Sequence, residues 1–213
     1  VLKYEAVVQQ NANVEAGPSG TASNLKLSSR NQSTSTAHAK PANGGGMGTV
    51  GIGASVAVNS LENAARSEVS NNAGLSNVKN LTLEATGLHT VTTTADAGSS
   101  GGTAITPSAA FALITNSTTS RLGTHAMATP VSGNLSMTAT HDGTTTTKAN
   151  GQTTGSNLAI GASFALNSVT DTSTATLDRA LDATTVGSTA TIEALNTSKT
   201  TIETKAGSNG ASQ

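Results

Sequence analysis

Apolar and polar residues alternate with a period of two along much of this chain. A β-strand turns successive side chains to opposite faces, so the alternation predicts strands with one buried face. It is clearest at three pairs of positions: Val56 and Val58, Leu81 and Leu83, and Leu135 and Met137. Runs of threonine follow several of these segments, and β-branched residues favour extended backbone. The pattern therefore predicts an all-β protein built from short strands.

The segment 60–69 admits a second interpretation. Its sequence from Ser60 to Val69, with Gly74 shortly after, also fits a helix that begins at a capping serine and stops near a glycine. The corresponding segments 117–122 and 172–177 are rich in Ser and Thr, which form helices poorly. Because equivalent positions of a repeat adopt the same structure, we expect a strand here.

A unit of about 54 residues recurs along the chain. Each copy has a Gly- and Ala-rich apolar strand, a polar stretch, a short alternating strand and a threonine-rich run. The alternating strands begin at Leu25, Leu81, Leu135 and Ala190, which are 56, 54 and 55 residues apart. The copies correspond approximately to residues 1–46, 47–102, 103–156 and 157–213.

Strands that cannot bury their apolar face within one unit are stabilised when the units stack on one another. We therefore expect residues 1–213 to form a single elongated β-solenoid, a parallel β-helix in which each unit covers the next. With two coils in each unit, the chain would form roughly eight coils and a rod about 40 Å long. Tandem immunoglobulin-like sandwiches are the alternative, but they need about 100 residues each and usually bury an aromatic side chain.

The composition favours a narrow core. Charged residues make up 11% of the chain and aromatic residues 1%, namely Tyr4, Phe111 and Phe164. Large rings fill broad cores, whereas Ala, Val, Leu and Ile can fill a thin one. A net charge of −1 without a basic stripe predicts no nucleic-acid partner. No run approaches the ~20 apolar residues of a transmembrane segment, and without Cys the chain has no disulfide or thiolate metal site.

Three segments of the second unit resemble repeats of giant bacterial exoproteins: residues 51–59, 81–85 and 90–98. Filamentous-haemagglutinin-like and leukotoxin-like adhesins carry such repeats, and the resemblance covers almost the whole chain. It implies a right-handed parallel β-helix that is extracellular or at the cell surface, associated with the outer membrane. Implied partners are flanking repeats of the same long chain, further copies in a fibre, and glycans of host cells or matrix. Residues 1–5 lack an initiator Met and a signal-peptide pattern, so we expect a fragment.

Three histidines recur at nearly the repeat spacing. His38, His89 and His141 are 51 and 52 residues apart, so they are expected to project from one side of the solenoid at intervals. Zinc sites in proteins combine several Cys or His ligands, and none of these histidines has such a neighbour in the sequence. We expect exposed loop histidines, no metal and no cofactor.

Two further motifs have a simpler explanation than catalysis. Residues 46–51 match Gly-x-Gly-x-x-Gly, but no strand clearly precedes them as a nucleotide-binding turn requires, so we expect a glycine-rich corner. Asp171, Asp178 and Asp182 form the local group of carboxylates, beside Arg179. Polysaccharide-cleaving enzymes use paired carboxylates, yet their clefts also use aromatic platforms, and this chain has one Tyr and no Trp. We expect no catalytic residues, and a polysaccharide-degrading enzyme is a third hypothesis.

The threonine runs are the candidate binding surface. Thr90, Thr92 and Thr94 alternate along one strand, as do Thr145 and Thr147 in the next copy. Stacked strands would align their hydroxyl groups into a face that binds ice or a glycan. Ordinary β-propensity also accounts for threonine in strands. We therefore expect a structural or adhesive segment of a large secreted or surface protein, acting as a stalk or fibre, with ligand binding on the threonine face as the alternative.

Overall fold

The structure is a computed structural model that describes residues 1–41, 48–182 and 189–210. These residues form eleven β-strands and no helix, so the expectation of an all-β protein is confirmed. In chain order the strands are β1 (Leu2–Val8), β2 (Asn13–Glu15), β3 (Ser23–Ala39), β4 (Val50–Ile52), β5 (Ser55–Val69), β6 (Gly74–Ser76), β7 (Val78–Leu122), β8 (Thr129–Pro130), β9 (Leu135–Leu177), β10 (Leu181–Asp182) and β11 (Ala190–Gly210). The expected strand at residues 60–69 is confirmed as part of β5.

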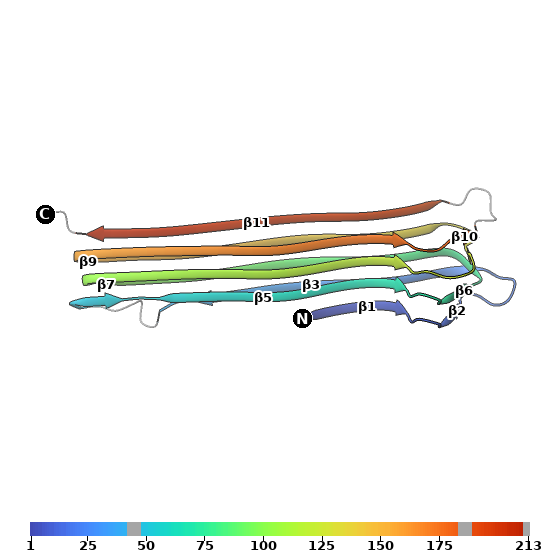
Figure 1. Ribbon diagram of the computed structural model, residues 1–213, viewed down its shortest axis with the longest axis horizontal. Helices are drawn as coiled ribbons and strands as arrows, with labels where there is room; N and C mark the ends of the chain where they lie inside the picture. The colour runs from blue at the N-terminus through green and yellow to red at the C-terminus, as the bar shows by residue number, and fades with distance from the viewer. Residues whose placement is uncertain (42–47, 183–188, 211–213) are drawn as a thin grey trace.

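The strand pairs of the described residues are all parallel. The main sheet has the order β1-β5-β7-β9-β11, and β3 and β4 also pair with β7. Two short pairs, β2 with β6 and β8 with β10, form separate small sheets. Figure 1 shows the long strands side by side along the molecule, with the short pairs gathered at one end.

Paired strands lie one repeat apart in the sequence. Leu25 pairs with Leu81, Leu81 with Leu135 and Leu135 with Ala190, which are the four positions where the repeated strand was expected to begin. Each unit therefore adds one strand to each layer of the stack. The expected two coils per unit are wrong, because such coils would pair strands half a repeat apart and the described residues contain no pair of that kind.

The strands β7 and β9 each reverse direction near their middle. Ser120 Oγ donates a hydrogen bond to the Leu83 carbonyl oxygen at 3.0 Å, and Ala110 packs with Ala95. The bend follows Gly101, where the pairing register with β9 shifts. Figure 1 shows the chain running the length of the molecule and returning along it. Each half has about 20 residues and spans about 65 Å, so the strands are long rather than short as expected.

Two layers of strands result from these reversals. The outgoing layer consists of β3, the first halves of β7 and β9, and β11, whereas the returning layer consists of β1, β4, β5 and the second halves of β7 and β9. The unit boundaries expected at 102/103 and 156/157 lie at the bends of β7 and β9, and the boundary at 46/47 lies outside the described residues.

The two layers enclose a thin interior in which aliphatic side chains alternate with small polar ones. Near the turns beside β6 and β8 it contains larger side chains, including the fully buried Leu81, Leu83 and Met137. Toward the bends it narrows to a cluster of four alanines: Ala57, Ala95, Ala110 and Ala149. Small side chains let the layers approach closely at that end, so a packed core forms without buried phenylalanine or tryptophan.

Arg179 holds together the turns that lead from a returning half to the next outgoing half. Its buried guanidinium donates hydrogen bonds to the carbonyl oxygens of Ser70 at 3.1 Å and Ala73 at 2.8 Å, and to that of Gly123. Nη1 also donates to Thr129 Oγ1 at 3.3 Å. Because these acceptors belong to turns one and two repeats earlier in the chain, one side chain joins three successive turns.

Candidate functional site

The outer surface of the outgoing layer carries a regular array of threonines. The pairing register aligns Thr36, Thr92, Thr146 and Thr201 in one row across four strands, and Thr34, Thr90 and Thr144 in the adjacent row. We call these seven residues the threonine face. Its side chains are exposed or half-buried and stand at every second position of each strand. The array offers repeated hydroxyl and methyl groups at the ~4.8 Å spacing between neighbouring strands.

Only part of the predicted threonine set belongs to this face. Thr90, Thr92 and Thr94 point outward as expected. Thr145 and Thr147 are 4% and 0% exposed and point into the interior, so assigning them to the surface needs correction. The pairing of Thr90 with Thr144 shows the reason. The offset of 54 between these strands is even, and side chains alternate with a period of two, so outward positions keep the same parity from β7 to β9.

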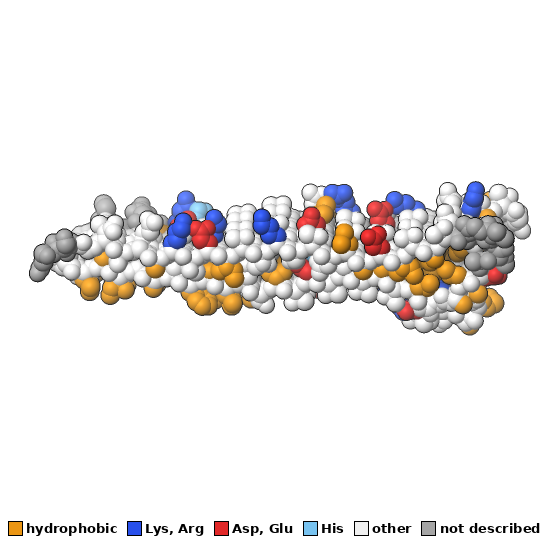
Figure 2. Space-filling view, turned by 90° about the horizontal axis from the view of Figure 1, so that it is seen from above, with side chains coloured by type: hydrophobic (Ala, Val, Ile, Leu, Met, Phe, Trp, Pro, Cys, Tyr) orange, Lys and Arg blue, Asp and Glu red, His pale blue; other side chains and the backbone are white. Residues whose placement is uncertain are grey.

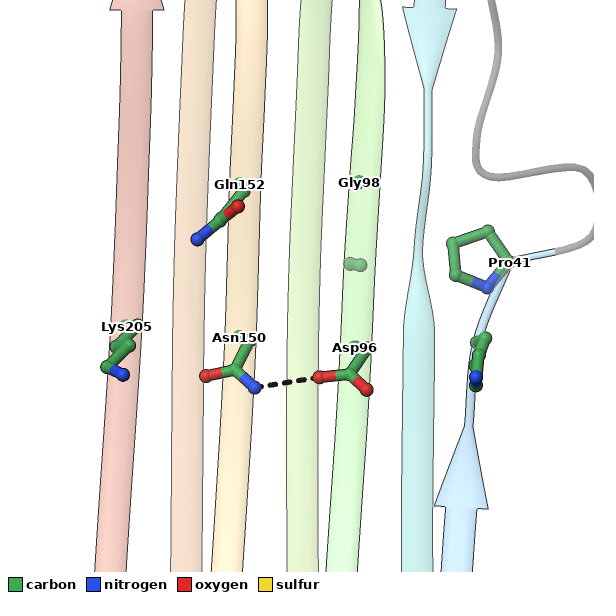
Figure 3. Close-up of a pocket in the computed structure, with 8 residues that line it drawn as sticks. Pro41, Asp96, Gly98, Asn150, Gln152 and Lys205 are labelled. Carbon is green, nitrogen blue, oxygen red and sulfur yellow. Dashed lines mark hydrogen bonds between the residues drawn. The ribbon is translucent and has the colours of Figure 1, made fainter.

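A shallow pocket of about 480 Å³ opens beside the threonine face, near the bends. Figure 3 shows the side chains that line it, with Asp96 and Asn150 on neighbouring strands. Asn150 Nδ2 donates a hydrogen bond to Asp96 Oδ1 at 2.7 Å, and His38 Nε2 lies 2.6 Å from Asp96 Oδ2. Two lysines, Lys40 and Lys205, also line the pocket.

The carboxylate in this pocket is held in its ionised form. Partial burial raises the pKa of Asp96, but the hydrogen bonds from Asn150 and His38 and the charges of His38 and Lys40 outweigh it and lower the pKa below its usual value. General acid catalysis needs a carboxyl group whose pKa is raised toward neutral pH. The pocket is therefore suited to holding a small polar group between charged side chains rather than to donating a proton from Asp96.

A second polar cluster lies inside the molecule, between the two layers. His89 and His141 are 5% and 0% exposed, and their ring centroids are 5.2 Å apart. His89 Nδ1 lies 2.9 Å from Ser33 Oγ, and His141 Nε2 lies 3.4 Å from Asp171 Oδ1. The expectation that these two histidines are exposed in loops is wrong, because both stand at inward positions of long strands. His38 does lie at the surface, in contact with Asp96.

Glycines make room for the two rings. Gly87 pairs with His141, and His89 pairs with Gly143 on the neighbouring strand. A Cβ atom on Gly87 would lie 3.0 Å from His141 Nδ1 and 3.2 Å from His89 Nε2, and one on Gly143 would lie 2.8 Å from His141 Nε2. The His141 ring therefore occupies the space that a side chain on either glycine would need, and the His89 ring also limits the space at Gly87.

Both buried histidines are neutral at pH 7. Burial, with a smaller contribution from the nearby His141, lowers the pKa of His89 to about 4, while Asp171 opposes the shift. Burial also lowers the pKa of His141, although Asp171 and Asp142 raise it. Amide hydrogen bonds continue the cluster through the stack, from Asn63 to Asn116 at 2.8 Å and from Asn116 to Asp171 at 2.7 Å. The cluster has the properties of a buried structural ladder.

The carboxylates expected to group together are separated by the fold. Asp171 is buried beside His141, whereas Asp178 accepts a hydrogen bond from Arg121 Nε at 2.9 Å and Asp182 lies in β10. Within residues 1–41, 48–182 and 189–210, no three His, Cys, Asp or Glu side chains gather closely enough to hold a metal ion. The part of the chain that the structure describes also has no helix long and apolar enough to cross a membrane.

The glycine-rich motif at residues 46–51 is only partly described. Gly46 and Met47 lie outside the described residues. Gly48 has a φ of 133°, a conformation that favours glycine, and its carbonyl oxygen accepts a hydrogen bond from Gly102 N at 2.9 Å. This contact places the second half of the motif beside the bend of β7.

The chain matches no family model, and no curated protein or solved structure is significantly similar to it. The threonine face, the pocket and the buried histidine cluster are therefore described from the structure alone. Sequence inspection missed the role of Arg179 and the contact between His89 and His141. For the threonine face, the sequence did contain a usable signal. Equivalent positions in the outgoing halves of β7 and β9 are 54 residues apart, an even number, so this spacing assigns each threonine to the inside or the outside.

Proposed function

We propose that this chain is a structural or adhesive segment of a right-handed β-solenoid that serves as a stalk or fibre in a large secreted or cell-surface bacterial protein. The supporting observation is the constant pairing of each unit with the next, at Leu25, Leu81, Leu135 and Ala190. Units that contact only their neighbours form a stack whose extent across the strands depends on their number. A stalk needs that property and no catalytic centre.

The edges of the stack favour continuation by further repeats. Among the residues that the structure describes, β11 pairs with β9 alone and β1 with β5 alone, so both strands present a row of unpaired backbone groups at an edge. Such edges pair readily with another strand. We propose that flanking repeats of the same chain cover them, and that separate copies join there in a fibre.

The surface chemistry agrees with a location outside the cell, associated with the outer membrane. The chain has no Cys, and only 11% of its residues are charged. The resemblance of its repeats to those of bacterial exoproteins supports the same location. Host-cell or matrix glycans are the proposed targets of adhesion, and no cofactor is part of the proposal.

Removal of one whole unit tests the solenoid directly. Deleting residues 81–134 joins Asn80 to Leu135, which stands one strand further along in the same register as Leu81. We expect this variant to keep a β-rich circular dichroism spectrum and the same length in small-angle scattering, with a stack that is thinner by about 4.8 Å. Deleting residues 81–107, half a unit, is the control and should prevent folding. Loss of structure in both variants, or in neither, would contradict the proposal.

The threonine face supports a second candidate function, binding of ice or a glycan. The row of Thr36, Thr92, Thr146 and Thr201 is the observation that favours it. Thermal hysteresis and retention on a glycan array measure the two activities. Replacing Thr92 and Thr146 with Lys should abolish the activity, whereas Thr115→Lys on the returning layer should not. Equal activity in all variants would exclude this face as the binding site.

A further inference from the structure

The outer surface of the returning layer is apolar over three neighbouring strands. Its outward residues in segments 50–58, 103–113 and 158–166 include Ile52, Val56 and Phe164, which are 62%, 63% and 53% exposed. We call these outward residues the apolar face. Its one polar member is Thr103, and none is charged. In Figure 2 apolar side chains gather along one long edge of the molecule and charged side chains along the opposite edge.

Around residues 109–114 the inward positions are apolar as well, a combination that is unusual for a strand in contact with water, whereas inward positions elsewhere in these segments include the buried Ser55, Thr106 and Ser108. Residues 109–114 read Ala-Ala-Phe-Ala-Leu-Ile, an uninterrupted apolar run. Strands with one wet face alternate apolar and polar residues, whereas strands buried on both faces have continuous apolar runs. The outgoing layer, by contrast, carries charged pairs on its outer surface, such as Lys26 with Glu84 and Lys148 with Glu203. The outward positions of segments 50–58, 103–113 and 158–166 are therefore those of a sheet that is covered on its outer side, whereas the part of the returning layer nearer the turns carries charged pairs such as Glu5 with Arg66.

The side chains of the apolar face form rows of different height across the strands. Ile105 is aligned with Ile52 on one side and Ile160 on the other, and together they form a ridge. Pro107 is aligned with Ala162, two positions further along, where the side chains are smaller, so this row is expected to be lower than the ridge. A two-fold axis between these rows would set the ridge of each copy against the lower row of the other.

We propose that the apolar face binds the same face of a second copy, with the strands of the two copies antiparallel. Eleven residues along the strand and three strands across give a face of about 35 Å by about 14 Å, or about 500 Å² in each copy. Two such faces bury about 1,000 Å², the area at which specific interfaces begin, and each further repeat enlarges it. This pairing of two outer faces is separate from the continuation of the stack proposed above, in which further strands are added at its edges.

The chemistry of the face favours a second copy over a membrane. Surfaces that lie on a bilayer combine apolar residues with flanking Lys, Arg, Trp or Tyr. The outward positions of segments 50–58, 103–113 and 158–166 contain none of these four residues. Cores of protein interfaces are likewise depleted in charge and enriched in Phe, as at Phe111 and Phe164, whose rings lie 5.6 Å apart.

Analytical ultracentrifugation of the whole chain tests the proposal. We expect the wild-type protein to dimerise and Ile105→Lys to weaken the dimer by about 100-fold or more, because the interface would bury an unpaired charge. Thr90→Lys, on the opposite surface, is the matched control and should dimerise like the wild type. Circular dichroism and urea unfolding of Ile105→Lys should match the wild type, since the substituted side chain is outward.

A mixture of two variants shows whether the partner is the same face. Ile105→Lys and Ile105→Glu should each be monomeric alone and should form a mixed dimer together, because the two-fold axis brings opposite charges close to each other. A wild-type protein that stays monomeric at its highest soluble concentration would overturn the proposal, as would an Ile105→Lys variant that dimerises normally. A monomer that binds lipid vesicles through this face would overturn it in favour of a membrane partner.

Discussion

His89 is a basic side chain enclosed between two layers of strands, against His141 and Ser33. Folding keeps its ring neutral, because a charge there would lose its hydration. The charged groups near the pair are Asp171, which opposes the shift of both rings, and Asp142, which acts on His141. At the scale of single residues, the fold therefore depends on the protonation of this buried pair.

Acidification is expected to destabilise the protein between pH 6.5 and about 4. The unfolded chain binds a proton on His89 near the ordinary histidine pKa of 6.5, whereas the folded chain does so only near 4, so stability falls as the pH falls through this window. The loss from His89 amounts to about 3 kcal/mol at most. Urea unfolding at a series of pH values measures it. His89→Gln should flatten the dependence, whereas His125→Gln, outside the interior cluster, should leave it unchanged.

Arg179 is the second residue on which the fold depends. Replacing it with Ala leaves the buried carbonyl oxygens of Ser70, Ala73 and Gly123 without this donor. We expect the free energy of unfolding to fall by about 3 kcal/mol, because hydrogen bonds from a charged donor are among the stronger ones. Urea unfolding measures the change, and Arg179→Lys should recover less than half of it. The exposed Arg30→Ala is the control, and a similar loss there would contradict this role.

The inward side chains of the strand β7 differ in size between its turn end and its bend, although its pairing is uniform. Near the turns its inward residues are Leu81 and Leu83, and near the bend they are Ala95 and Ala97. One strand thus spans a wider and a narrower part of the same core. The width of the interior at each point follows from the size of the residues at inward positions.

Enlarging a side chain at the narrow end should separate the layers. Ala95 is fully buried among other alanines, so Ala95→Leu is expected to lower the free energy of unfolding by about 1–3 kcal/mol. Thr94→Leu, at the adjacent outward position, is the control and should change it by less than about 0.5 kcal/mol. Thermal or urea unfolding compares the two. Equal effects would mean that the two positions do not lie on opposite sides of β7.

At the scale of the whole molecule, stability depends on contacts between neighbouring units. The outgoing half of β7 is paired on both edges, with β3 and β9, whereas β11 is paired only with β9. The protection of backbone amides against hydrogen exchange should therefore differ between the strands of the stack, as in other repeat proteins.

Amide hydrogen exchange should follow this order of pairing. We expect the slowest exchange in residues 81–95 of β7 and faster exchange throughout β11, because opening of a terminal strand breaks one set of pairs and opening of a central strand breaks two. Mass spectrometry of peptides from the two segments measures the difference. Uniform protection across both strands would show that the stack unfolds as one cooperative unit.

Most of the strand content and the repeat alignment could be predicted from the sequence, because period-two alternation and a recurring Leu-x-Leu or Leu-x-Met segment are local signals. The equivalence of Leu25, Leu81 and Leu135 followed from the same signals, but their direct pairing did not, because two coils in each unit were expected. The burial of Thr145 and of His141 could not be predicted from these local signals. It depends on whether the spacing between paired positions, here 54 residues, is an even or an odd number. The length of the strands was also missed, because glycines such as Gly101 often end a strand and here mark a bend within one.

The sequence by itself determined that the chain forms repeating β-strands around a thin core without large rings, because side-chain alternation, repeat length and the scarcity of aromatic residues are properties of the chain alone. The tertiary structure decided which face of each strand is buried, where the strands reverse and which distant residues meet. It brought His89 to His141, placed Arg179 across three turns and left one outer face apolar and the other polar. Those outcomes depend on how two layers lie against each other, and each layer is assembled from segments more than 50 residues apart.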